Sequence, residues 1–411
     1  MSKREDVVLI TNSFPQWSAT EPSFVEPELE ALRRKFRRVI IVPVTLRGAG
    51  AVTPLEGVET DTSWALGPDW NSRVRRSRFL ANPRMWLDVR GDIMRRGIAF
   101  GVAARAFASF LRRMVAEQGL SWENTLFYTF WFDFPAAALA LLKANHPEIR
   151  FVSRAHGHDM FTSLGGRLRH RMLREAEAVY TASQAGADFL RQTFPEASAD
   201  DKVRVSTLGC VKLYPEAVAA RHKRADRRFA FLSVSRVDEN KRVEMNARLL
   251  RALAVARPDT AIRWIHVGDG PSMAAVREAV KECPPNLEVE LRGTVPNAEV
   301  QRIYRDEAVD WFMLLSLHEG GRAVAACESL AYGVPVVATD VEALNEVVDD
   351  ECGLMLSPDS TDEEFVRGIA PYLDSDFRAE AMREAALSRW NSDFNAAMLR
   401  PAFVDMISHI E

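Results

Sequence analysis

Short apolar runs alternate with segments of helical spacing through most of the chain. The run DVVLIT at residues 6–11 is typical of a strand that is buried on both faces of a sheet. Residues 24–36 carry apolar side chains three and four positions apart, which is the repeat of a helix, and a second apolar run follows at residues 39–44. Strand, helix and strand at this pitch predict a parallel α/β unit.

The same alternation continues to the end of the chain. Further strands are predicted at residues 125–130, 149–155, 178–182, 203–207, 229–233, 262–267, 288–292, 310–315 and 336–339, and helices at 135–144, 243–256, 299–305, 323–332 and from about 376 onward. Since 411 residues are too many for one ordinary core, we expect two α/β domains. Residues 210–228 are polar, basic and without strand character, so we interpret them as the linker between domains at 1–209 and 229–389.

Composition places the chain among soluble globular proteins, with 47% hydrophobic and 27% charged residues. No apolar run approaches the ~18–20 residues that span a bilayer. The start, MSKREDVVLI, leads directly into a strand and lacks the pattern of a signal peptide. The four cysteines are scattered without a C-x-x-C pair, which argues against a zinc site and fits a reducing cytosol. We therefore expect a cytoplasmic protein.

Arginines are concentrated in one segment, from Arg73 to Arg113. It holds eleven arginines against two acids, Asp88 and Asp92, and aromatic residues are interleaved with them. Such a segment can lie on an anionic membrane surface. The alternative is one or two surface helices whose apolar face packs on the core while the arginines stay in water. Nucleic-acid binding is not expected, because no recognition motif accompanies the arginines.

A glycine-rich turn is predicted between an apolar strand and a helix, at Glu319-Gly320-Gly321. Free N–H groups and the dipole at a helix N-terminus attract phosphate, so the two glycines and Val324 are candidate phosphate-binding residues. Two carboxylates, Glu319 and Glu328, flank the turn and can bind sugar or ribose hydroxyls.

Two cations, Arg236 and Lys241, lie five residues apart on the turn that follows the strand at 229–233. At this spacing they can converge on one diphosphate and neutralise the charge that builds up on it as a sugar departs. The first turn of the chain, by contrast, lacks the G-x-G-x-x-G pattern, which argues against a dinucleotide-binding dehydrogenase.

The predicted strand at 149–155 ends in His156-Gly157-His158-Asp159. Ligands of open α/β sheets bind beyond the carboxyl ends of the strands, so His156 is a candidate site residue, ahead of His158. Asp159 is interpreted as a cap of the following turn.

Taken together, these motifs resemble the donor site of retaining GT-B glycosyltransferases of glycosyltransferase family 4. The resemblance rests on S-R-x-x-x-x-K at 235–241, the two glutamates, the G-x-P turn at 333–335 and the stretch SRAHGHDMF at 153–161. The last stretch is similar to bacterial members that assemble capsule, O-antigen or exopolysaccharide. Eight residues separate the two glutamates here, whereas the family usually has seven.

The resemblance implies a GT-B fold, with two Rossmann-like domains whose parallel sheets face each other across a cleft and a last helix, from about 390 to 411, that crosses back to the acceptor-binding N-terminal domain. It also implies roles for single residues: catalysis by His156 and Glu319, diphosphate binding by Arg236, Lys241, Gly320, Gly321 and Val324, ribose binding by Glu328, and contact with the nucleobase near Gly293, Thr294 and Val295.

The implied activity is transfer of a hexose-type sugar, with retention, from a UDP- or GDP-linked donor to a glycan or lipid-linked acceptor. The nucleotide sugar is a substrate, and neither a cofactor nor a metal is expected. An acceptor of this kind would place the enzyme at the cytoplasmic face of the membrane. Two alternatives stay open: a GT-B nucleotide-sugar epimerase, and a catalytically silent subunit that binds nucleotide sugar, for which the extra residue and Arg322 in the turn leave room.

Overall fold

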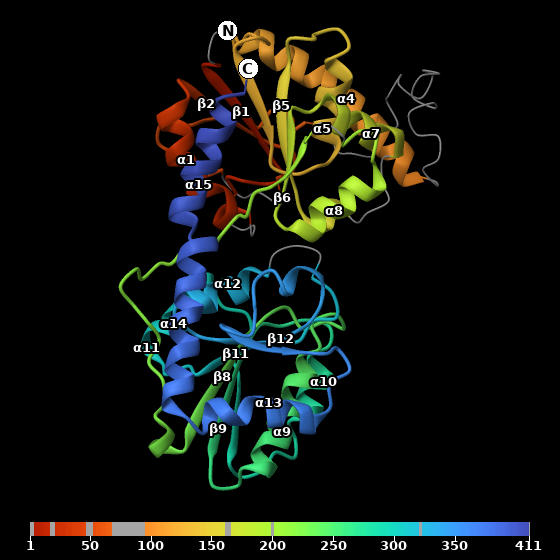
Figure 1. Cartoon of the computed structure of the whole chain (residues 1–411). Coiled ribbons are helices and arrows are strands. Elements are labelled where there is room, and N and C mark those ends of the chain that lie inside the picture. Colours follow the sequence, from red (N-terminus) through yellow and green to blue (C-terminus); the bar gives the residue numbers. More distant parts are fainter. Residues whose placement is uncertain are drawn as a thin grey trace. The chain divides into compact units, whose positions relative to one another are not determined.

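The computed structural model describes residues 4–16, 21–46, 52–67, 95–160, 166–198, 201–319 and 323–410. The chain divides into two compact units. Unit 1 comprises Met1–Leu208 and Ala397–Glu411, and unit 2 comprises Gly209–Ala396. Each unit has a parallel sheet with helices on both faces, as in Rossmann-like domains (Figure 1).

The sheet of unit 1 has seven strands in the order β3-β2-β1-β4-β5-β6-β7, and every pair is parallel. The strands are β1 (Asp6–Thr11), β2 (Arg38–Pro43), β3 (Glu59–Thr60), β4 (Thr125–Thr129), β5 (Arg150–Ala155), β6 (Ala178–Thr181) and β7 (Val203–Val205). The strand order reverses between β1 and β4, which makes the carboxyl end of these strands the expected ligand edge.

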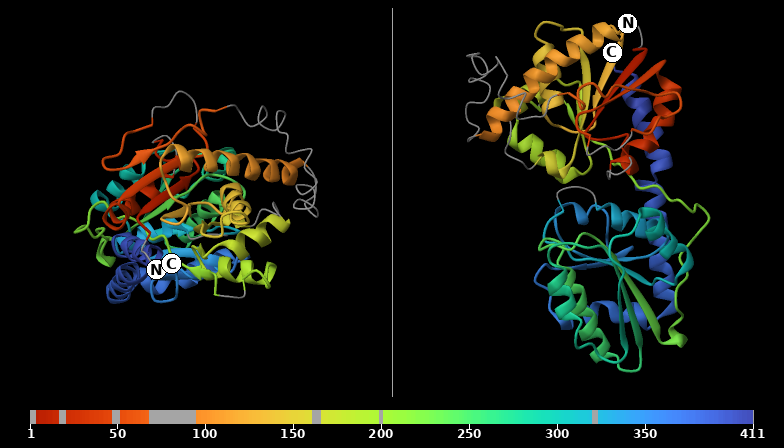
Figure 2. Two further views of the ribbon diagram at one scale, coloured as in Figure 1. Left: turned by 90° about the horizontal axis from the view of Figure 1, so that it is seen from above. Right: turned by 180° about the vertical axis from the view of Figure 1, so that it is seen from behind.

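Helices cover both faces of this sheet. They are α1 (Pro22–Lys35), α4 (Arg95–Glu117), α5 (Phe134–Leu142), α6 (Gly157–Met160), α7 (Gly166–Glu175), α8 (Gln184–Thr193) and α15 (Ala396–Ser408). The core on one face is shared with α4, α5, α7 and α8, and the core on the other face with α1 and α15 (Figure 2). Because alternate side chains of β1 point into the two cores, its four central residues, 7–10, are all apolar.

The arginine-rich segment is described only from residue 95 onward, where it forms α4. Residues 73–94 lie outside the described part. The aromatic side chains of Phe107 and Phe110 are buried in the core of unit 1, and Phe107 contacts Trp64 edge to face at 4.8 Å between ring centroids. In α4 the apolar face therefore packs on the core, as the second interpretation of this segment expected. Among the described helices, none combines the length and the apolar character needed to cross a membrane.

The sheet of unit 2 has six parallel strands in the order β10-β9-β8-β11-β12-β13. The strands are β8 (Arg228–Val234), β9 (Ala261–Val267), β10 (Leu287–Leu291), β11 (Trp311–Leu314), β12 (Val336–Thr339) and β13 (Gly353–Leu356). The helices are α9 (Val243–Ala256), α10 (Met273–Ala279), α11 (Asn297–Asp306), α12 (Val324–Ala331), α13 (Asp362–Leu373) and α14 (Asp376–Asp393), with short 3-10 turns at Arg224–Asp226 and Glu342–Leu344. One core involves α9, α10 and α13, and the other involves α11, α12 and α14.

The segment expected as a linker, residues 210–228, is packed within unit 2. The buried Cys210 donates its backbone N–H to the carbonyl of Phe394 at 2.9 Å, and the N–H of Ala219 donates to the carbonyl of Tyr332 at 2.9 Å. Part of the backbone of this segment is thus bound by the body of unit 2, while the side chains of Lys223, Arg227 and Arg228 are exposed. The boundaries between the units fall at 208/209 and 396/397.

Candidate functional site

In unit 2, the loops after β8 and β11 meet at the carboxyl edge of the sheet. The two strands are neighbours, and the strand order reverses between them. Asn240 joins the loops: its carbonyl oxygen accepts from the N–H of Leu317 at 2.8 Å, and its side-chain amide both donates to and accepts from the backbone of His318 at 3.0 Å. This edge therefore holds two loops joined by hydrogen bonds at the place where open α/β sheets bind ligands.

The loops bring together two of the predicted residues, Lys241 and Glu319. The Lys241 ammonium donates to Oε1 of Glu319, and the hydroxyl of Ser316 donates to the same oxygen at 2.7 Å. The lysine side chain is 22% exposed and the glutamate side chain 12%. The pair is thus shielded from water but open to one side, which strengthens its response to a charged ligand.

Arg236 extends from the same loop into solvent, with 71% of its side chain exposed. Its Nε lies 3.4 Å from Oδ2 of Asp238, a loose and exposed ion pair that contributes little stability. Asp238 is itself engaged, because its Oδ1 accepts from the backbone N–H of Lys241 at 3.1 Å. The guanidinium is therefore in a position to exchange this contact for an anion.

Close backbone packing joins the turns after β9 and β10 to the Arg236 loop. Gly268 has a φ of +142°, and a Cβ at this position would lie 1.8 Å from the carbonyl oxygen of Ser235. Its N–H donates to the carbonyl of Gly293 at 2.8 Å, and the N–H of Val237 donates to the carbonyl of Asp269 at 3.1 Å. Only glycine fits at position 268, so the V-G-D-G-P turn fixes the loop that carries the cations.

The predicted nucleobase region follows β10. Gly293 has a φ of +68°, Thr294 is exposed and Val295 packs against the core. Through Gly268, this turn is connected by backbone hydrogen bonds to the cation loop. The structure thus places these three residues at the same edge of the sheet as Arg236 and Lys241.

Glu328 lies on α12 and is 8% exposed. Burial raises the pKa of its carboxyl to about 7. The side chain of Asn297 donates to Oε1 of this carboxyl at 2.8 Å, and this hydrogen bond lowers the pKa in part. A carboxylate with this pKa changes charge near neutral pH.

The glycine-rich turn with Gly320, Gly321 and Arg322 lies outside the described residues. Val324 is the first residue of α12, after Ala323 at the N-cap. Phosphate binding by the amides of this turn stays a prediction.

In unit 1, His156 follows β5 and its ring lies against two aromatic rings, Phe130 at 5.1 Å and Trp131 at 4.5 Å between centroids. The side chain is 14% exposed, and Nδ1 is buried without a hydrogen-bond partner in the described structure. The two carboxylate oxygens of Asp159 accept from the N–H groups of His156 at 2.5 Å and Phe132 at 2.7 Å, which ties the ends of β5 and β4 together. Its role as a cap of the following turn stays a prediction, because residues 161–165 lie outside the described part. The side chain of His158 lies outside the described part.

Sequence reasoning missed Glu21, the residue before α1. This buried carboxylate accepts from the backbone N–H groups of Asn12 at 2.8 Å and Phe14 at 2.8 Å and from the indole of Trp131 at 2.6 Å. It thereby holds the loop after β1 and, through Trp131, the ring on which His156 rests. An acid at the start of a predicted helix was visible in the sequence, but its partners come from other strands.

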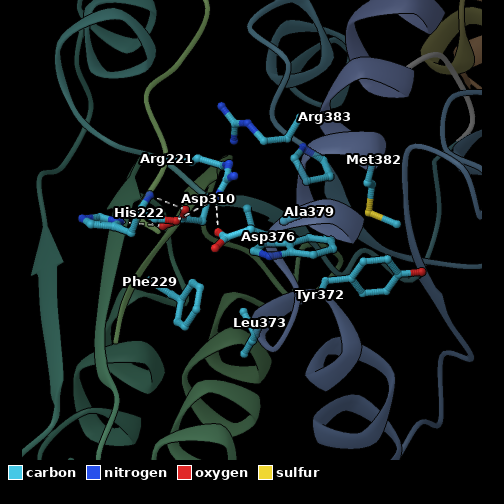
Figure 3. A pocket seen from close by; sticks show the side chains of 12 residues that line it. Arg221, His222, Phe229, Asp310, Tyr372, Leu373, Asp376, Ala379, Met382 and Arg383 are labelled. Atoms are coloured by element: carbon cyan, nitrogen blue, oxygen red, sulfur yellow. Dashed lines mark hydrogen bonds and ion pairs between the residues drawn. The ribbon is translucent and has the colours of Figure 1, made fainter. Parts of the chain in front are cut away.

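A small cavity of about 20 Å³ lies at the opposite, amino edge of the sheet of unit 2. Figure 3 shows the residues that line it. His222 pairs with Asp310 at 2.7 Å, and Arg221 pairs with Asp376 at 2.7 Å. There is room for about one water molecule. We interpret this cluster as a structural junction that fastens residues 210–228 to β11 and α14.

In the part of the chain that the structure describes, no group of three or more His, Cys, Asp or Glu side chains is arranged to hold a metal ion.

Comparison with known proteins finds a family match within the second unit. Residues 228–375 match the family model described as "Glycosyl transferases group 1". Over 183 residues the chain is 26% identical to the "Putative colanic acid biosynthesis glycosyltransferase WcaL" of Escherichia coli (strain K12). That match covers 43% of this chain and 44% of the relative, so it spans less than half of either protein.

Solved structures share the fold of the whole chain. Anabaena HepE in complex with UDP and glucose has a TM-score of 0.60 at 15% identity, over 100% of both chains. The lipopolysaccharide outer core galactosyltransferase WaaB has a TM-score of 0.67 at 12% identity, over 98% of this chain and 100% of that one. Sucrose-phosphate synthase from Thermosynechococcus elongatus has a TM-score of 0.64 at 15% identity, over 98% of both chains. The predicted GT-B fold class, two Rossmann-like parallel-sheet domains, is therefore confirmed.

Proposed function

We propose that this protein is a metal-independent, retaining glycosyltransferase that transfers a hexose-type sugar from a nucleotide-diphosphate donor to a glycan or lipid-linked acceptor. The observation that carries the proposal is the joined pair of loops after β8 and β11 of unit 2. There Lys241 contacts Glu319, and Arg236 lies exposed on the same loop as Lys241. The match of residues 228–375 to a glycosyltransferase model supports a transferase, and the UDP and glucose bound to HepE support a nucleotide sugar as donor.

The charges at this edge suit a departing nucleotide diphosphate. When the bond between the sugar carbon and the phosphate oxygen breaks, negative charge builds on that oxygen, and two cations close to it lower the energy of this state. In our proposal Arg236 and Lys241 take the diphosphate, and Lys241 exchanges part of its contact with Glu319 for it. Glu319 then faces the sugar. The acceptor oxygen bonds to the same face of the sugar carbon, and its proton passes to the leaving phosphate oxygen.

The acceptor is proposed from the relatives. WcaL is named for colanic acid biosynthesis and WaaB for the lipopolysaccharide outer core, and both point to cell-surface glycans. Contact of the segment 73–113 with an anionic membrane surface belongs to the same proposal. Flotation of the full chain with vesicles of neutral lipid, with and without added anionic lipid, tests it; failure to float with either kind would overturn membrane binding.

Thermal unfolding with UDP, GDP, ADP and TDP tests the donor site. A nucleotide at about 100 times its Kd is expected to raise the free energy of unfolding by roughly 2.7 kcal/mol, which is a measurable shift in Tm. We expect one nucleotide to give this shift, and Arg236→Ala to abolish it. No shift with any of the four would overturn the proposed function.

Arg227→Ala is the matched control. Arg227 is exposed to a similar degree, 66% of its side chain, and has an equally loose acidic partner, Asp259 at 3.4 Å. It precedes β8, at the opposite edge of the sheet. The control should keep the full shift in Tm with nucleotide.

Donor turnover in the absence of any acceptor would instead identify an epimerase or a hydrolase.

A further inference from the structure

A chain of side-chain hydrogen bonds leads from Glu328 into the interior of unit 2. Asn297, the first residue of α11, donates through Nδ2 to Oε1 of Glu328 at 2.8 Å. Its own Oδ1 accepts from Nε2 of Gln301 at 2.9 Å. Gln301 lies one helical turn further on the same face of α11 and is 1% exposed. Glu328 is thus held by an amide that is itself held by a buried amide.

The direction of every hydrogen bond in this chain is fixed by its inner end. Oε1 of Gln301 accepts from the backbone N–H of Leu213 at 2.8 Å and from the hydroxyl of Tyr332 at 2.7 Å, and Nε2 donates to the carbonyl of Val211 at 3.0 Å. A backbone N–H only donates and a carbonyl only accepts, so Gln301 cannot be turned over without placing donor against donor. Asn297 must therefore offer its oxygen to Gln301 and its NH₂ group to Glu328.

At Glu328, this arrangement does two things. It restrains one carboxylate oxygen and leaves the other for a ligand, and it supplies a donor that stabilises the ionised form. Among the residues that the structure describes, the titratable groups in electrostatic contact with Glu328 are the phenols of Tyr304 and Tyr332. Burial raises the pKa of both phenols, and the Glu328 charge raises them further, so both are neutral near pH 7. Within the described part of the chain, Asn297 is thus the group that opposes the effect of burial on the pKa of Glu328.

We propose that Asn297 is a positioning residue that presents Glu328 in one orientation and in its ionised form to the ribose hydroxyls of a nucleotide, and that Gln301 fixes Asn297 in turn. The choice of ligand rests on the proposed function. Because Gln301 also binds Val211 and Leu213, the same amide holds the chain just after it enters unit 2.

Titration of the Glu328 carboxyl in the full chain tests the positioning without any ligand. Glutamate labelled with ¹³C at the side-chain carboxyl is observed by NMR, and Glu328→Gln identifies the resonance by its loss. Removing a donor to a charged group is expected to raise the midpoint by about one to two pH units in Asn297→Ala, and Asn297→Asp, which places a second carboxylate there, should raise it further. Asn297 is exposed, so neither variant opens the core.

Glu299→Gln is the control, since Glu299 lies in the same first turn of α11 and pairs with Arg302. In Glu299→Gln, the titration midpoint of the Glu328 carboxyl should equal that in the unchanged protein. An unshifted midpoint in Asn297→Ala would overturn the positioning role, whether or not nucleotides bind.

The second arm measures the Kd of the nucleotide diphosphate found by thermal unfolding, between pH 6 and pH 9. Affinity should rise with pH as Glu328 ionises, and Asn297→Ala should bind about tenfold more weakly at pH 7 but within about twofold of the unchanged protein at pH 9. Weakening by the same factor at every pH would mean a merely structural role and would overturn the inference. Absence of nucleotide binding by the unchanged protein would overturn the proposed function, while the carboxyl titration still decides the positioning role.

Discussion

Arg400 donates through Nη1 to Oε1 of Glu28 at 2.6 Å, although 372 residues separate them in the sequence. Their side chains are 1% and 0% exposed. Arg154 donates to the same oxygen at 2.8 Å, and the hydroxyl of Tyr128 donates to the other oxygen at 2.9 Å. One carboxylate on α1 therefore holds β4, β5 and the C-terminal helix α15 in unit 1.

We expect Glu28→Gln to destabilise the protein more than Arg400→Met does. The first change leaves two buried guanidinium groups without a counter-charge, whereas the second leaves Arg154 and Glu28 as a balanced pair. Loss of one partner from a buried ion pair costs about 3–5 kcal/mol, and Glu28→Gln should fall in this range. Urea unfolding of the full chain at pH 7, followed by tryptophan fluorescence, measures both.

The control is Lys35→Met. Lys35 pairs with Asp405 between the same two helices, but at the surface, with 35% and 52% of the side chains exposed. Its loss should change the free energy of unfolding by at most about 1 kcal/mol. Equal effects of Glu28→Gln and Arg400→Met would contradict the charge argument.

Acid should unfold the protein partly through Glu28. Burial by itself would raise the pKa of this carboxyl, but the charges of Arg154 and Arg400 outweigh it, and the pKa is lowered below its usual value of 4.5. The stabilisation is therefore present above pH 4.5 and is lost as the pH falls below that value. Stability curves between pH 3 and pH 6 should be steeper for the unchanged protein than for Glu28→Gln, and parallel curves would show that Glu28 does not carry this dependence.

Glu319→Gln should separate binding from transfer. The amide keeps the size of the side chain but removes a negative charge beside Lys241, so a nucleotide diphosphate should bind at least as tightly as before. Transfer should fall by about 10²–10³-fold if the carboxylate contacts the sugar in the transition state. Glu239→Gln, an exposed acid on the cation loop, should leave transfer unchanged. A loss of nucleotide binding equal to the loss of transfer would contradict the assigned role.

His156→Ala should leave the nucleotide shift in Tm intact, because the proposed nucleotide residues belong to unit 2 and His156 belongs to unit 1. Transfer should fall by about 10²-fold if the imidazole binds beside the donor sugar. His170→Ala, an exposed histidine that contacts Phe194 in the same unit, is the control. Unchanged transfer in His156→Ala would remove this residue from the site.

Gly268→Ala should disrupt the donor site. The new Cβ would lie 1.8 Å from the Ser235 carbonyl, so the loop with Arg236 must move, and nucleotide binding should be lost. Gly119→Ala is the matched control, with a φ of +64° and no atom within 4 Å of the new Cβ. It should cost only the backbone strain, on the order of 1–2 kcal/mol, and keep nucleotide binding. Equal Tm shifts with nucleotide in both variants would exclude the close packing as a condition for binding.

Much of the fold was predictable from local pattern. The bounds of β1, β12 and α9 agree with the prediction at both ends, because each has a strong apolar repeat and clear breakers beside it. No strand was predicted at β13, since the four residues Gly353–Leu356 are too few to show a period. The two-residue strand β3 was missed for the same reason.

The sequence by itself determined the α/β alternation, the number of sheets and the strand ends that carry Arg236, Lys241, Glu319 and His156, because these depend on residues near one another in the chain. Only the tertiary structure decided that Lys241 contacts Glu319, since the order of strands in the sheet, and not their order in the chain, makes β8 and β11 neighbours. The tertiary structure likewise decided the raised pKa of Glu328, through burial, and the partners of Glu28. Desolvation and ion pairing depend on atoms from distant segments, which no local pattern contains.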